Sequence, residues 1–118
     1  MAGDIKKGEK IFKARGQQCH TLQQGVHGLG PSLFGLFGRR VASEPDYNYS
    51  SAMQVNNSQI WTEEMLYAFL ENPKKFMPGT KMSFEGLKRI EEREHLIAYL
   101  KSVIGEASES IDNPAMSI

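Results

Sequence analysis

The pattern of apolar and polar positions is helical toward the end of the chain. From about residue 88 to residue 104, apolar side chains recur at helical spacing; they are Ile90, Leu96, Ile97, Leu100 and Ile104. The charged residues 91–94, which include Arg93, are expected on the solvated side. We therefore predict an amphipathic helix that stops at Gly105, since glycine is favoured just after a helix.

Near the start of the chain, a second helical pattern follows Asp4, a suitable N-cap residue, and runs to about Arg15. Its narrow face consists of Ile5, Gly8, Phe12 and Arg15. A glycine inside a helix costs about 1 kcal/mol relative to alanine. We therefore expect another element to approach the backbone closely at Gly8.

A third helix is predicted to start at Thr62, whose hydroxyl can cap it, and to end at Pro73. The acidic pair that follows Thr62 favours the positive end of the helix dipole. The expected buried face comprises Met65, Leu66, Phe69 and Leu70.

Residues 21–60, between His20 and Trp61, show neither a helical nor a strand period and contain many glycines and prolines. Such a long irregular segment is unusual in a compact domain unless something else organises it. Its apolar side chains nevertheless need burial; they are Leu29, Leu33, Phe34, Leu36 and Phe37. Three short helices offer them little surface, so a large apolar prosthetic group would supply the missing core.

Composition and charge add only broad limits. The chain is 40% hydrophobic and 24% charged, and its 14 basic and 14 acidic residues give no net charge, which argues against a nucleic-acid partner. Residues 1–104 carry a net charge of +3, because three acidic residues fall in the aperiodic last segment. We expect one domain over residues 1–104 and an acidic mobile tail over residues 105–118. No apolar run approaches the roughly 20 residues that span a bilayer, and no amino-terminal signal region is evident.

Candidate chemistry lies in the segment "GQQCH", residues 16–20, which contains the only cysteine of the chain, Cys19. Haem bound through two thioether bonds is typical of Cys-x-x-Cys-His, but here Gly16 stands at the first cysteine position. Three interpretations remain: a haem with one thioether, a buried thiol beside a structural histidine, or a Cys-His catalytic dyad. His27 and His95 have no neighbouring attachment point, so structural roles are expected for them.

A haem that transfers electrons also needs a ligand on its opposite face, and methionine is a common partner of histidine. Of the six methionines, Met65 lies on a predicted helix face, where packing is expected. Met82 lies in "MPGTKMSF", between a Pro-Gly turn and Phe84, where a loop can direct its side chain inward. Met82 is therefore the preferred candidate.

Several segments together resemble the mitochondrial cytochrome c family: "GDIKKGEKIF", "CHT", "GPSLFGLFGRR", "ENPKKFMPGTKMSFEGLK" and "EREHLIAYLK". The resemblance covers about residues 3–104. It implies an all-α, class I c-type fold in which short helices and long loops wrap one haem and the two terminal helices cross. The lone cysteine is similar to that of the single-cysteine members of certain flagellate protists, which implies haem c held by one thioether bond.

The resemblance also implies a role for individual residues. Cys19 would anchor the haem covalently, with His20 as the proximal and Met82 as the distal iron ligand. Arg39, Tyr49 and Trp61 match residues that hydrogen-bond the haem propionates, and the carbonyl of Pro31 would orient the proximal imidazole. The remaining expected cofactor contacts are Thr80, Phe69 and Phe84, with Phe69 standing where the family usually has a tyrosine. Gly8, Phe12, Leu96 and Tyr99 match the crossing of the terminal helices.

The implied function is electron transport in the mitochondrial intermembrane space, from the cytochrome bc1 complex to cytochrome c oxidase, by a monomer whose iron cycles between Fe(III) and Fe(II). Peripheral contact with a membrane surface is compatible with this role. The basic residues implied for docking are Arg15, Lys74, Lys75, Lys81, Lys88 and Arg89. Two other classes stay open: a haem peroxidase or sensor with a labile Met82 ligand, and a haem-free helical interaction module.

Overall fold

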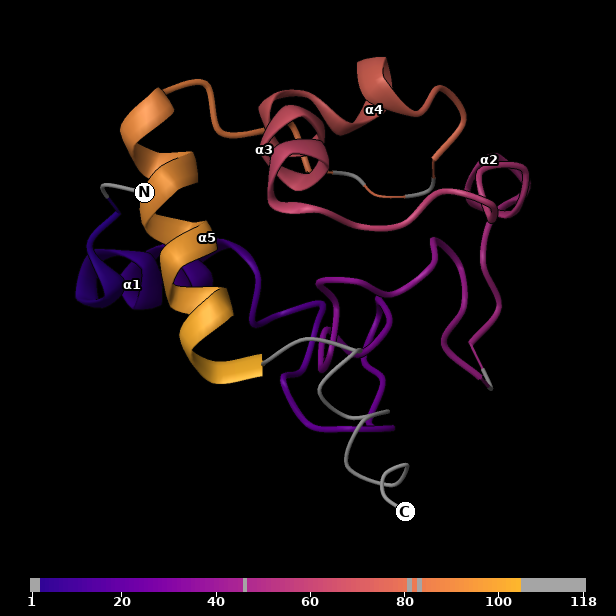
Figure 1. The fold of residues 1–118 in the computed structure, drawn as a ribbon, viewed down its shortest axis with the longest axis horizontal. Coiled ribbons are helices and arrows are strands. Elements are labelled where there is room, and N and C mark those ends of the chain that lie inside the picture. The colour runs from indigo at the N-terminus through magenta and orange to yellow at the C-terminus, as the bar shows by residue number, and fades with distance from the viewer. Residues whose placement is uncertain (1–2, 46, 81, 83, 105–118) are drawn as a thin grey trace.

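The structure is a computed structural model that describes residues 3–45, 47–80, 82 and 84–104. Its helices are α1 (Ile5–Arg15), α2 (Ser51–Gln54), α3 (Glu63–Glu71), α4 (Pro73–Phe76) and α5 (Ile90–Ile104) (Figure 1). Within the described ranges, extended pairing is limited to one isolated antiparallel bridge between Arg40 and Ile60. The all-α fold class is therefore confirmed.

The two terminal helices pack against each other, and Gly8 lies where they meet. A Cβ atom added at Gly8 would overlap the carbonyl oxygen of His95 and lie 2.7 Å from the Cβ of Tyr99. The ring of Phe12 lies 6.0 Å from the ring of Tyr99. The close approach predicted from Gly8 is thus confirmed, since only glycine lets the two backbones come this near.

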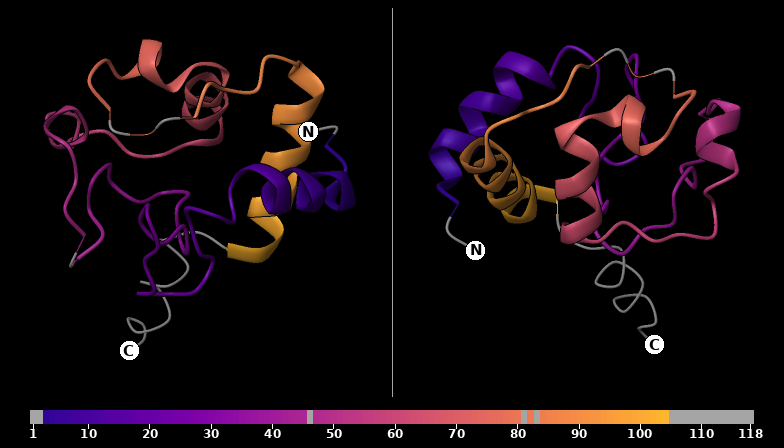
Figure 2. Two further views of the ribbon diagram at one scale, coloured as in Figure 1. Left: turned by 180° about the vertical axis from the view of Figure 1, so that it is seen from behind. Right: turned by 90° about the horizontal axis from the view of Figure 1, so that it is seen from above.

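Helices α3 and α4 lie on one side of the long irregular segment of residues 20–50 (Figure 1). Seen from above, α1 and α5 lie on one side, α2 on the other, and α3 and α4 between them (Figure 2). The chain from residue 20 to residue 50, which we call the loop region, runs largely below α3 and α4 in Figure 1. None of the helices described is long and apolar enough to cross a membrane.

The predicted starts of two helices are confirmed. The Asp4 carboxylate accepts a hydrogen bond from the Lys7 amide at 3.1 Å, which caps α1. Backbone hydrogen bonding at this N-cap lowers the pKa of Asp4. The Thr62 hydroxyl accepts one from the Met65 amide at 3.0 Å, which caps α3. In both cases a short polar side chain satisfies an amide that has no partner inside the helix.

The predicted end of the third helix was wrong by two residues. Helix α3 ends at Glu71, and Pro73 begins the short helix α4 rather than ending α3. Asn72 joins the two helices, and its side chain accepts a hydrogen bond from the Lys75 amide at 3.2 Å. Proline is well suited to the first turn of a helix because its missing amide hydrogen is not needed there.

Helix α5 begins at Ile90, two residues later than predicted, and the expectation that Arg93 is solvated was wrong. Only 4% of Arg93 is exposed. Its guanidinium lies over the ring of Tyr67, with Cζ 4.4 Å from the ring centroid, and donates to the Leu87 carbonyl at 2.5 Å. A cation–π contact and a backbone acceptor offset part of the cost of burying this charge. Ile90 is largely exposed and therefore does not belong to the buried stripe.

The loop region contains more order than its sequence pattern suggests. Leu36 and Phe37 are buried and Leu33 and Phe34 are half-buried, as expected. Leu29 was expected to be buried but is exposed, because it lies at the tip of a turn in which the Gly28 amide donates to the Gly30 carbonyl. Beyond the loop region, the single turn of α2 was not predicted.

Candidate cofactor site

The Cys19-His20 pair lies directly after α1, where the chain turns. The amides of Cys19 and His20 both donate to the Gly16 carbonyl, at 3.0 and 2.9 Å. The Gly30 amide returns a hydrogen bond to the Cys19 carbonyl at 2.6 Å. The end of α1 and the following loop therefore hold the pair between them, with Cys19 as a half-buried free thiol.

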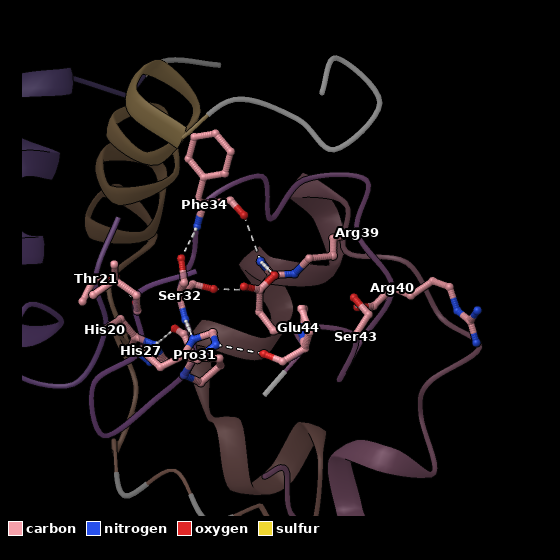
Figure 3. Close-up of polar contacts among 12 residues, drawn as sticks. His20, Thr21, His27, Pro31, Ser32, Phe34, Arg39, Arg40, Ser43 and Glu44 are labelled. Carbon is pink, nitrogen blue, oxygen red and sulfur yellow. Dashed lines mark hydrogen bonds and ion pairs between the residues drawn. The ribbon is translucent and has the colours of Figure 1, made fainter. Parts of the chain in front are cut away.

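The imidazole of His20 is oriented by the loop that packs on it. Its Nδ1 donates to the Pro31 carbonyl at 2.8 Å, as Figure 3 shows. A carbonyl only accepts, so the proton is on Nδ1, and the lone pair of Nε2 remains available to a metal. A Cβ atom added at Gly30 would lie 2.7 Å from His20 Nδ1, so the imidazole packs directly on the glycine backbone. Burial lowers the pKa of His20 and so favours the neutral ring, although the Pro31 hydrogen bond opposes this shift.

The Arg39 side chain lies among several hydrogen-bond acceptors of the loop region (Figure 3). Its Nη1 donates to the Phe34 carbonyl at 2.9 Å and to the Glu44 carboxylate at 3.2 Å, and its Nη2 donates to the Ser32 carbonyl at 3.0 Å. Its Nε is buried and has no hydrogen-bond partner among the described residues. Burial lowers the pKa of Arg39, while Glu44 and Tyr49 act in the opposite direction. Arg39 therefore keeps one buried donor for a further acceptor.

Tyr49 and Trp61 lie next to residues 38–40, which we call the Arg39 segment. The Tyr49 hydroxyl accepts a hydrogen bond from the Glu44 amide at 3.1 Å, and burial raises the pKa of Tyr49. Trp61 is buried, and its backbone is paired with the Arg39 segment: its amide donates to the Arg39 carbonyl at 2.9 Å. The structure thus brings together the three residues expected near the propionates.

The segment around Met82 supplies the other candidate ligand. Met82 is half-buried, and its amide donates to the Thr80 hydroxyl at 3.3 Å. Phe69 is buried, with its ring edge-to-face with Trp61 at a centroid distance of 5.3 Å. Phe69 offers no hydroxyl to a ligand. Among the described residues named here, Thr80 is the one that places a hydroxyl next to Met82.

Among the expected docking residues, Lys81 lies outside the described residues, and the other five are exposed. Arg15 lies over the half-buried ring of Phe84, with Cζ 5.1 Å from its centroid. Lys74 and Lys75 project from α4, whose last turn they occupy. These three side chains place positive charge next to Phe84 and α4.

The remaining two docking candidates, Lys88 and Arg89, contact acceptor groups on neighbouring residues. The Lys88 ammonium donates to the Glu71 carbonyl at 2.7 Å, at the end of α3, and to the Glu85 carbonyl at 3.2 Å. Arg89 lies 3.9 Å from the carboxylate of Glu91. Lys88 therefore also stabilises the carboxyl end of a helix, and its exposed charge is partly held in place.

Comparison with known proteins places these features in a family. The family model described as cytochrome c matches residues 5–103. The chain belongs to the cytochrome c family. A cytochrome c of Sesamum indicum is 55% identical over 100 residues, which cover 84% of this chain and 89% of that relative. One of Euglena viridis is 46% identical over 101 residues, which cover 86% of this chain and 98% of the relative. One of Gibberella zeae is 49% identical over 100 residues, which cover 84% of this chain and 93% of that relative.

Membership of the cytochrome c family gives the chain a function and a cofactor in general terms. Proteins of this family are electron carriers rather than enzymes, and they hold haem c covalently. The predicted electron-transfer role and the resemblance itself are therefore confirmed.

The residues present are compatible with haem. The buried Nε of Arg39, for which the described residues supply no acceptor, suits a carboxylate such as a propionate. An imidazole of His20 that carries its proton on Nδ1 and leaves Nε2 available suits iron. Sequence reasoning did not single out Glu44, which turns out to pair with Arg39. The only sequence signal is an acidic residue five positions after a basic one, and in an irregular loop that spacing does not predict a contact.

Proposed function

We propose that this chain carries single electrons from the cytochrome bc1 complex to cytochrome c oxidase in the mitochondrial intermembrane space. In this proposal the haem is joined to Cys19 by one thioether bond and ligated by His20 and Met82. Residues 1–104 form the cytochrome domain, and residues 105–118, which lie outside the described residues, form an acidic tail. The hydrogen bond from His20 Nδ1 to the Pro31 carbonyl carries the proposal, because it presents Nε2 of a neutral imidazole next to the only cysteine.

Bound haem supplies a one-electron Fe(III)/Fe(II) couple. The residues of the chain would keep its surroundings unchanged as that electron arrives and leaves. Pro31 holds the imidazole of His20 in one orientation, and Gly30 packs on the ring. The buried rings of Trp61 and Phe69 exclude water, and a pocket with a low dielectric constant favours the less charged ferrous state. Arg39 and Tyr49 supply hydrogen-bonding groups for the propionates.

Docking in this proposal relies on Arg15, Lys74, Lys75, Lys81, Lys88 and Arg89. The five described members are exposed, and Arg15 lies beside Phe84, which we place at the edge of the haem. Positive charge around that edge would steer the protein toward acidic surfaces on its redox partners. We expect association to be fast at low salt and to slow as salt screens these charges.

The single thioether can be tested on the protein after expression in a host that attaches haem. Mass spectrometry should show the chain plus one haem, and Cys19→Ser should lose that added mass. The reduced pyridine haem spectrum should lie to the red of a two-thioether haem, because one vinyl group remains unreacted. A spectrum typical of two thioethers would contradict the attachment through Cys19 alone.

The Met82 ligand is tested separately by the ferric absorption spectrum. A weak low-spin band near the red end, diagnostic of methionine–iron ligation, should be present at neutral pH and should disappear in Met82→Ala. Met65→Leu is the matched control, because Met65 is half-buried on α3 and should leave the band unchanged. Absence of the band from the unaltered protein at neutral pH would instead favour a sensor or peroxidase with a labile Met82 ligand.

A further inference from the structure

The ion pair between Arg39 and Glu44 differs from the other ion pairs of the described residues in its burial. Its side chains are only 12% and 14% exposed, and the two charged groups are 3.2 Å apart. The pairs Lys13–Glu9, Arg89–Glu91 and Lys101–Glu63 are all much more exposed. Salt and solvent screen a buried charge much less than an exposed one, so the charge of Glu44 acts at longer range inside the protein.

Glu44 also lies at the centre of the hydrogen bonds that position the Arg39 segment. Its carboxylate accepts from Arg39 Nη1, while its backbone amide donates to the Tyr49 hydroxyl at 3.1 Å. One residue therefore contacts two of the three side chains that the proposed function places at the propionates. The Arg39 Nε, which is buried and has no hydrogen-bond partner in the described part of the chain, remains available to donate to a second carboxylate.

We propose that Glu44 lowers the reduction potential of the bound haem by neutralising Arg39. Glu44 is a positioning residue in this proposal: it touches Arg39 rather than the haem. The argument rests on the proposed function, in which Arg39 holds a propionate. With Glu44 in place, the guanidinium contributes little net positive charge at the haem edge. Removing the carboxylate would restore that charge and favour Fe(II), which carries one positive charge fewer than Fe(III).

The test is the midpoint potential of the haem-loaded Glu44→Gln variant, which keeps the shape of the side chain and removes its charge. We expect a positive shift equivalent to a several-fold change in the equilibrium constant for reduction, where tenfold is 59 mV for one electron. The shift should persist at high salt because the pair is buried. Glu91→Gln, which removes the same charge from the exposed pair with Arg89, should leave the potential nearly unchanged.

Two further variants separate charge from packing. Glu44→Asp keeps the negative charge and should have a potential close to that of the unaltered protein. Glu44→Ala also lacks the charge and should shift the potential upward; it serves if Glu44→Gln does not load haem. An unchanged or lower potential in the charge-free variants overturns the proposal, as does an upward shift of equal size in Glu44→Asp.

Arg39→Gln distinguishes this failure from failure of the propionate assignment. If Arg39 holds a propionate, Arg39→Gln should lower the potential, since it removes a positive charge from the haem edge. A lower potential in Arg39→Gln combined with no shift in Glu44→Gln would refute only the role of Glu44. No shift in either variant would refute the placement of Arg39 as well.

Discussion

Where α1 crosses α5, the two backbones meet directly, whereas in the loop region side chains bridge backbone groups that do not meet. At the crossing, Gly8 lies against the carbonyl of His95, and the contact depends on the absence of a side chain. In the loop region, Arg39 donates to the carbonyls of Phe34 and Ser32, and His27 joins two further loop segments. The crossing therefore depends on shape. The loops around the candidate site depend on a small number of polar side chains in addition to backbone hydrogen bonds such as that from Gly30 to Cys19.

The largest effect is expected from Gly8→Val at the crossing. The new Cβ would overlap the His95 carbonyl oxygen, so α1 and α5 would have to separate. Overpacking typically costs about 1–3 kcal/mol and occasionally more, and an overlap with a backbone carbonyl belongs at the upper end of this range. Denaturant unfolding should show a lower midpoint for the whole domain. Lys10→Ala, on the exposed face of α1, should change stability by less than about 0.5 kcal/mol. An unchanged midpoint in Gly8→Val would mean that the crossing tolerates separation.

Arg39→Met should have a smaller and more local effect. It retains the apolar part of the side chain but leaves the Phe34 and Ser32 carbonyls without their donors. Leaving buried acceptors unpaired costs about 1–3 kcal/mol. The substitution should therefore accelerate hydrogen exchange more in the loop region than in α1 and α5. Arg40→Met is the matched control, because Arg40 is exposed and its guanidinium donates to Asn57 rather than to the carbonyls of Phe34 and Ser32. Equal acceleration in both helices would show that the two regions unfold together.

The two regions also differ in how far the sequence predicts them. The cap at Asp4, the cap at Thr62 and the contact at Gly8 depend on neighbouring residues or on the absence of a side chain, and all three were predicted correctly. The four residues of α2 are too few to show a helical period. The burial of Arg93 depends on Tyr67 and Leu87, which belong to other segments, and a charged residue in a charged run gives no sign of them.

The same reasoning applies to the candidate site. The sequence predicts His20 and Met82 because they belong to short motifs, and Pro31 through the resemblance to the cytochrome c family. The structure brings His20 and Pro31 into hydrogen-bond contact. The acceptors of Arg39 are mostly backbone carbonyls, and a sequence carries no information on which carbonyl a loop turns inward. Glu44 was missed for this reason: its contact depends on a loop conformation and not on a periodic spacing.

His27→Gln compares a histidine of the loops with one of the crossing. His27 Nδ1 accepts from the Ser32 amide at 2.9 Å, so the ring proton is on Nε2, which donates to the Pro45 carbonyl at 3.0 Å. The glutamine side chain cannot reproduce both hydrogen bonds in the same geometry, so the variant should lose about 1–2 kcal/mol of unfolding free energy. Hydrogen exchange of the Ser32 amide should become faster. Among the described residues, the His95 side chain accepts one hydrogen bond, from the Asp4 amide at 2.9 Å, so His95→Gln should affect mainly the first turn of α1. A uniform loss of protection in His27→Gln would contradict the local role of this side chain.

The smallest effect, and a stabilising one, is expected from Ala42→Gly in the loop region. Ala42 has φ of 58°, in the left-handed region that disfavours residues with a Cβ. Relief of that strain should exceed the added flexibility of glycine in the unfolded chain and leave a net gain of about 0.5–1 kcal/mol. The reverse change, Gly25→Ala, introduces a Cβ at φ of 75° with no neighbour within 4 Å, so it isolates the backbone cost and should destabilise by a similar amount. Thermal unfolding of the two variants should shift in opposite directions. If Ala42→Gly lowers the melting temperature instead, contacts of the Ala42 methyl group outweigh its backbone strain, and this part of the loop region depends on packing as the helix crossing does.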